Sequence, residues 1–168
     1  MGRIGIFWFL LAVTLLVYGL LVGWAGQDMI ALTNGAAIPD LRVTGYGVDD
    51  IRALLDGAEP GFPEAYARIS RTWDVAVPVL FGVTFAYGIW LGGGAWRWLA
   101  LVPVVMGLSD LTENALVTQS LLAGPDALDP GTIGRASAAT MLKWLLLPVS
   151  ILLLVATFFK TRARASKG

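Results

Sequence analysis

The chain has 168 residues, of which 57% are hydrophobic and 14% charged, and its mean hydropathy is +0.71. This composition is too apolar for a water-soluble domain and is typical of a polytopic membrane protein. The absence of cysteine and histidine excludes disulfides, thiolate or imidazole metal sites, histidine-ligated haem and Ser-His or Cys-His catalysis. We therefore expect neither a metal nor a cofactor.

The first apolar run covers residues 5–26 and is long enough to cross a bilayer. We expect it to be retained as a membrane helix, because a cleaved signal peptide has a shorter apolar region and a clearer small-residue cleavage site. The run contains a GxxxG motif from Gly19 to Gly23. This motif predicts close packing of the helix within a bundle.

Residues 27–72 form a segment that is too long for an ordinary connection and too short to build a core of its own. We expect a loop followed by two short helices. Asp49 and Asp50 suit the start of the first helix, which ends near Gly57. Pro63 opens the second helix, which is expected to run directly into the second span. The segment is predicted to fold back as an extracytoplasmic lid.

Three further apolar runs cover residues 75–91, 96–122 and 137–159, with a glycine turn at 92–94 between the first two. The sequence therefore predicts an all-α fold in a single domain. The predicted fold is an integral membrane four-helix bundle with a short extracytoplasmic helical lid between its first and second helices.

Basic residues indicate how the bundle is oriented. Arg3, Arg97 and the Lys/Arg-rich tail after residue 159 share one side with no acid among them, whereas segments 27–72 and 123–136 carry nine acids. The positive-inside rule then predicts a bacterial inner-membrane protein with both termini in the cytoplasm. The basic tail is interpreted as a topology determinant on an anionic leaflet, so no nucleic-acid partner is expected.

Charged side chains interrupt the apolar runs at Asp74, Asp110, Glu113 and Lys143. Bilayer hydrocarbon makes such groups costly unless they pair, protonate or serve a function. Because a helix rises about 1.5 Å per residue, all four are expected at a similar height in the outer leaflet. Three carboxylates against one ammonium leave an excess of negative charge, which a low-dielectric pocket resists by holding protons or recruiting a cation.

Polar side chains adjoin these four charged groups on two of the predicted helices. Asn114 shares a face with the acids of the third span, and Thr140 and Trp144 flank Lys143 on the fourth. A purely structural lock between Lys143 and the carboxylates remains an alternative interpretation, because buried pairs often serve register. Trp144 suits core packing as well as stacking on a ligand.

The segment 73–78 carries an acid followed by a proline, and Asp28 comes just after the first apolar run. With four predicted helices and both ends in the cytoplasm, this pattern resembles the EXPERA-domain proteins, which include sterol isomerases and a sterol- and amine-binding receptor. The resemblance implies a sterol-like or hydrophobic amine ligand held by an acidic pair, a place that Asp28 and Asp74 can fill. Isomerases of that family also use histidine, which this chain lacks. Segments 110–114 and 45–46 are also similar to uncharacterised bacterial four-helix inner-membrane proteins.

The leading functional hypothesis is an acidic outer-leaflet pocket that binds a lipid-like or amphiphilic cationic small molecule from the membrane. The predicted ligand-binding residues are Asp28, Asp74, Asp110, Glu113, Asn114, Thr140, Lys143 and Trp144. One alternative is an accessory subunit of a larger membrane protein complex. Another is an intramembrane acid–base enzyme, either similar to a lipid isomerase or using Asp74 and Asp110 as an aspartyl dyad.

Overall fold

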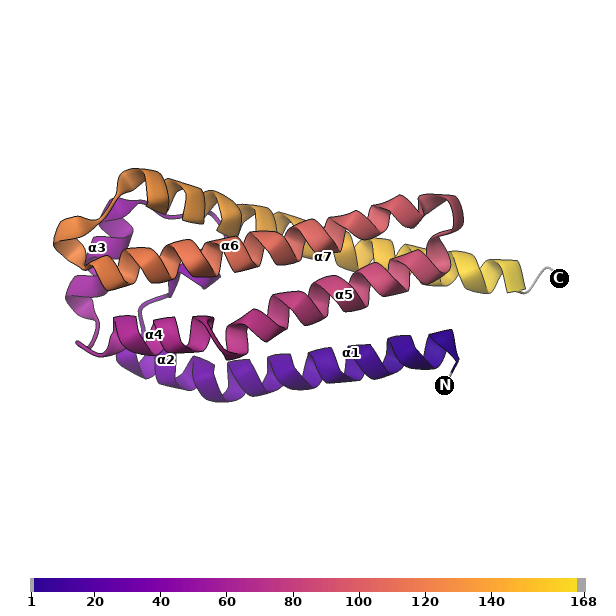
Figure 1. Ribbon diagram of the computed structural model, residues 1–168, viewed down its shortest axis with the longest axis horizontal. Coiled ribbons are helices and arrows are strands. Elements are labelled where there is room, and N and C mark those ends of the chain that lie inside the picture. The colour runs from indigo at the N-terminus through magenta and orange to yellow at the C-terminus, as the bar shows by residue number, and fades with distance from the viewer. Residues whose placement is uncertain (1, 166–168) are drawn as a thin grey trace.

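The computed structural model describes residues 2–165, with side chains up to residue 160. Within these residues every regular element is a helix, and both ends of the chain lie at the same end of an elongated molecule (Figure 1). The stretches Arg3–Leu32, Phe62–Ala123 and Pro130–Lys160 are long and apolar enough to cross a membrane. The predictions of an all-α chain and of membrane-length apolar helices are confirmed. The side of the membrane on which the termini lie stays a prediction.

Helix α1 (Arg3–Leu20) continues through a π-helical turn (Leu21–Ala25) into α2 (Gly26–Leu32). The prediction of a loop from residue 27 is therefore wrong at its start. The stop signal lies at Asn34 and Gly35, which both have positive φ, and the Gly35 N–H closes the helix end on the Ile30 carbonyl.

The two glycines of the GxxxG motif, Gly19 in α1 and Gly23 in the π-helical turn, do not pack within the bundle. A methyl group placed at Gly19 or Gly23 would meet nothing within 4 Å, so the predicted close contact is wrong. Instead α1 contacts α5 through buried Thr14, whose hydroxyl lies 2.8 Å from that of Thr84.

The two short helices predicted after residue 47 are confirmed as α3 (Val48–Gly57) and α4 (Phe62–Ser70), and a 3₁₀ turn precedes them at Pro39–Leu41. Their apolar side chains form a shared core with α6 and α7, in which Phe62 and Ile51 pack with Val117 and Ile133. The connection between α2 and α5 therefore covers the end of the molecule opposite the termini (Figure 1).

Helix α4 does not run directly into the second span. The chain breaks at Thr72, which has φ −121° and ψ −87°, and α5 (Trp73–Gly93) starts in a new direction. The Thr72 hydroxyl donates to the Arg68 carbonyl at the end of α4. This break places Arg71 and Asp74 at a bend instead of along one continuous helix.

Helices α5 and α6 (Leu101–Ala123) form the predicted hairpin, which reverses at Gly94 with φ +55°. Residues Gly94–Ala100 are 3₁₀ helix, so the α-helix starts later than residue 96. A start at Leu101 puts Pro103 in the first turn, where its missing N–H leaves no hydrogen bond unmade.

Glycines bring the two antiparallel helices close together. A methyl group at Gly107 would lie 2.7 Å from the Pro78 carbonyl oxygen, and one at Gly82 would lie 3.2 Å from that of Pro103. This contact holds Asp74 beside α6.

Helix α7 (Pro130–Ala165) is the longest element and packs antiparallel against α6 (Figure 1). It begins after a 3₁₀ turn at Pro125–Ala127, seven residues before the apolar run at 137–159. Asp129 caps it, because its carboxylate accepts hydrogen bonds from the Thr132 N–H at 2.7 Å and hydroxyl at 2.6 Å. These bonds hold the pKa of the exposed Asp129 carboxyl below its usual range.

Candidate functional site: a buried ion cluster beside a pocket

An ion cluster joins α6 to α7 in the half of the bundle away from the termini. The Lys143 ammonium lies 3.0 Å from the Asp110 carboxylate, 2.5 Å from that of Glu113 and 3.7 Å from that of Asp40. The Glu113 side chain is fully buried and the other three are no more than 17% exposed. Charged groups of the third and fourth predicted spans therefore meet at the same height along the molecule.

Helical geometry explains why α6 and α7 supply this cluster. Asp110 and Glu113 are three residues apart on α6, so one face of the helix presents both carboxylates. Lys143 lies on the antiparallel helix α7 and reaches between them. The structure contains the ion pairs between Lys143 and these carboxylates on which the alternative of a purely structural lock depends.

The structure adds Asp40 to the cluster, a residue that sequence reasoning missed. It lies in the 3₁₀ turn of the connection, where the Trp144 indole donates to its carbonyl at 2.7 Å and the Tyr66 hydroxyl donates to its carboxylate at 2.6 Å. No local pattern predicts these contacts, since Asp40 and Trp144 are 104 residues apart. Only the presence of an acid beside Pro39 in an otherwise apolar stretch could have drawn attention to it.

Thr140 and Tyr46 close the cluster on the side of the connection. The fully buried Thr140 hydroxyl lies 3.2 Å from the Tyr46 hydroxyl, and the Tyr46 N–H donates to Ser137 at 2.8 Å. Gly45 permits this approach, because it has φ +88° and a methyl group there would lie 2.7 Å from the Ser137 hydroxyl. Burial raises the pKa of the Tyr46 phenol well above its usual range, so Tyr46 stays neutral.

Asp74 lies at the edge of the cluster. Its carboxyl is close enough to Asp40, Asp110 and Lys143 for their charges to affect it. The buried Asn114 amide has no hydrogen-bond partner among the described side chains. Among the described side chains no cation forms an ion pair with Asp74. The exposed Asp28 on α2 has no hydrogen bond or ion pair that joins it to this group.

The charges in this region do not balance. Four carboxyl groups, those of Asp40, Asp74, Asp110 and Glu113, face the single ammonium of Lys143. Oxygens of three of them lie within 4.8 Å of one another, a spacing that suits a bound cation, and the Lys143 ammonium provides a cation for the same three groups. Of these four carboxyl groups, Asp74 is the one that forms no ion pair with Lys143.

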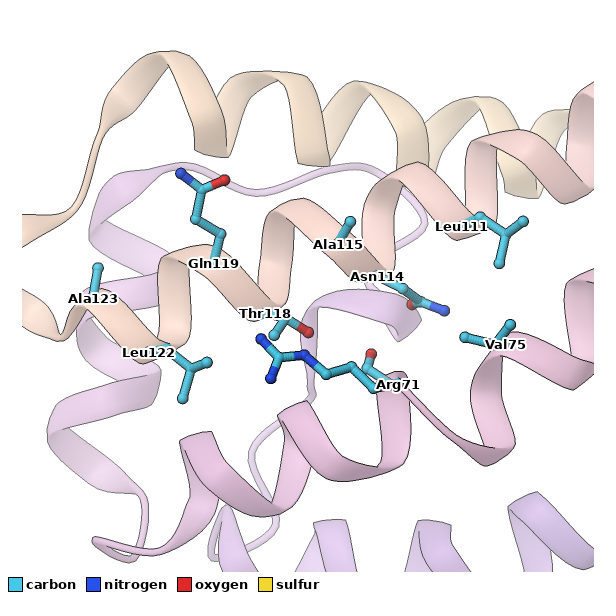
Figure 2. Close-up of a pocket in the computed structure, with 10 residues that line it drawn as sticks. Arg71, Val75, Leu111, Asn114, Ala115, Thr118, Gln119, Leu122 and Ala123 are labelled. Atoms are coloured by element: carbon cyan, nitrogen blue, oxygen red, sulfur yellow. The ribbon is translucent and has the colours of Figure 1, made fainter.

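A pocket of about 670 Å³ opens beside the cluster, between α6 and the junction of α4 with α5 (Figure 2). Asn114 and Val75 form the wall that adjoins Asp74. The full lining comprises Ser70, Arg71, Val75, Leu111, Asn114, Ala115, Thr118, Gln119, Leu122 and Ala123. Of the predicted site residues Asn114 lines this pocket, and Asp110, Glu113 and Lys143 lie in the adjacent cluster. Thr140 and Trp144 hold the connection in place.

Comparisons of this chain with protein-family models, with curated proteins and with solved structures give no match.

Proposed function

We propose that this protein binds a lipid-like or amphiphilic molecule carrying an amine, which enters the pocket between α4, α5 and α6 from the membrane. Its ammonium interacts with Asp74 and Asn114, and its apolar chain lies along Val75 and Leu111. In the predicted orientation the pocket opens in the outer leaflet of the inner membrane.

The observation that carries this proposal is the unbalanced charge beside an open pocket. Lys143 is already in contact with Asp110 and Glu113, whereas Asp74 has no ion-pair partner among the described side chains. A carboxylate in a low-dielectric region is costly to leave unpaired, and a ligand ammonium would remove that cost. Apolar walls with a few polar groups are also usual for small-molecule sites of this volume.

A hydrophobic amine is also the ligand class that the resemblance to EXPERA-domain proteins implies, but the acidic pair differs. Asp28 is exposed on α2, so we propose that Asn114, and not Asp28, contacts the ligand ammonium together with Asp74. An aspartyl dyad would need Asp74 and Asp110 to share a hydrogen bond. The described side chains show none between them, and Asp110 accepts a hydrogen bond from Lys143.

Binding of dodecylamine to the purified protein in lipid nanodiscs tests the proposal. We expect saturable binding that is at least tenfold weaker in Asp74→Asn and at least tenfold weaker for uncharged dodecanol. Asp56→Asn removes an exposed acid on α3 and serves as the matched control, with affinity within twofold of wild type. Asp28→Asn is also expected to bind normally. Equal affinity of wild type and Asp74→Asn for dodecylamine would rule the proposal out.

A further inference from the structure

The pocket contains polar groups that an amine does not explain. Ser70 and Thr118 are each 4% exposed, they line the pocket, and their hydroxyl oxygens have no hydrogen-bond partner. Buried polar groups are almost always paired, because an unpaired one costs about 1–3 kcal/mol. These two hydroxyls therefore indicate a polar group of a ligand that the chain itself does not supply.

A cation faces the same space. Arg71 follows the last residue of α4, and Figure 2 shows its side chain extending across the pocket with the guanidinium turned toward Thr118 and Leu122. Among the described side chains no carboxylate pairs with it. A guanidinium is a planar fork of N–H donors that suits a phosphate or carboxylate, and two hydroxyls beside it can donate to the same oxygens.

The site therefore has two poles. The Arg71 pole is positive and rich in donors. The negative pole is Asp74, which is not itself part of the lining but precedes the lining residue Val75 in the chain. Apolar side chains at Val75, Leu111 and Leu122 lie along the same pocket. Trp73 is half exposed at the start of α5, as an aromatic side chain at the membrane–water interface would be.

We infer that the ligand is a zwitterionic amphiphile, whose oxyanion binds Arg71, Ser70 and Thr118 while its ammonium binds Asp74. A phosphoethanolamine-type headgroup on an acyl chain has this chemistry. The inference rests on the proposed function, since it assigns the second half of the headgroup to the same pocket.

Three probes separate the parts of this inference: lysophosphatidylethanolamine, dodecylamine and water-soluble phosphoethanolamine. Wild-type protein in nanodiscs of phosphatidylcholine is expected to bind lysophosphatidylethanolamine at least tenfold more tightly than dodecylamine. Phosphoethanolamine, which lacks the chain, is expected to bind at least 100-fold more weakly than the lysolipid. Equal affinity for phosphoethanolamine and lysophosphatidylethanolamine would overturn the assignment of an amphiphile.

Variants then test the oxyanion contacts. Arg71→Gln should weaken lysophosphatidylethanolamine binding at least tenfold and change dodecylamine binding less than threefold. Arg68→Gln, an exposed arginine of α4 outside the pocket lining, should leave both within twofold. Thr118→Val should weaken lysolipid binding without lowering the thermal stability of the unliganded protein, because its hydroxyl has no partner there.

The failures are distinguishable. If wild type binds neither dodecylamine nor the lysolipid, the proposed function is wrong and this inference with it. If dodecylamine binding depends on Asp74 but Arg71→Gln leaves lysolipid affinity unchanged, only the zwitterionic assignment is wrong.

Discussion

Replacing Lys143 with methionine removes the cation that three carboxylates share. The Lys143 ammonium contacts Asp110 and Glu113 directly and lies 3.7 Å from Asp40. Breaking a buried ion pair by removing one partner typically costs about 3–5 kcal/mol, because the other charge remains buried and uncompensated. We expect the free energy of unfolding of Lys143→Met to fall by that amount.

The assay is equilibrium unfolding in mixed micelles with increasing dodecyl sulfate, followed by circular dichroism at neutral pH. Arg135→Gln, an exposed cation on the same helix, is the matched control and should change the free energy of unfolding by no more than about 0.5 kcal/mol. Adding Asp110→Asn and Glu113→Gln to Lys143→Met removes the two stranded charges that Lys143 contacts directly and leaves that of Asp40, so it should recover part of the loss. A single variant as stable as wild type, or a triple variant no better than the single one, would refute this account of the cluster.

Two further predictions concern helix packing and capping. Gly107→Ala should lower the free energy of unfolding by about 1–3 kcal/mol, because its methyl group would meet the Pro78 backbone at 2.7 Å. Gly134→Ala, whose methyl group would meet nothing within 4 Å, should raise the free energy of unfolding by about 0.5–1 kcal/mol in the same micelle assay. Equal effects of the two substitutions would contradict the close α5–α6 contact. Because hydrogen bonds from Thr132 lower the pKa of the Asp129 carboxyl, its contribution to stability is present above the unfolded-state pKa of about 3.9 and is lost as pH falls through the lower folded-state value. Asp129→Asn retains a capping side chain that does not titrate, so its unfolding midpoint should fall less between pH 5 and pH 2 than that of wild type; parallel curves would contradict the assignment.

The sequence was sufficient for the part of the site that depends on helix geometry. The i, i+3 spacing of Asp110 and Glu113 predicts a shared face, and helix rise predicts that Lys143 reaches the same height. These inferences need only the 3.6-residue period and the lengths of the apolar runs. Acids at a helix start predicted α3, and Pro63 predicted the start of α4, for equally local reasons.

The sequence could not predict the parts that depend on tertiary contacts. Asp40 reaches the cluster because Trp144 and Tyr66 hold the connection, and such contacts leave no local period. The pocket forms because the chain bends at Thr72, where no glycine or proline marks a break. Two errors did have local signals: Asn34 and Gly35 mark the end of α2, and Pro103 favours a later start for α6.

The most direct test of the central claim is photolabelling with a long-chain alkylamine that carries a diazirine in its chain. The proposed function predicts that excess dodecylamine competes away the label on peptides containing Val75 and Leu111, and that this saturable fraction disappears in Asp74→Asn. Labelling that no excess of dodecylamine reduces, spread equally over the apolar surfaces of α1 and α7 in both proteins, would contradict it.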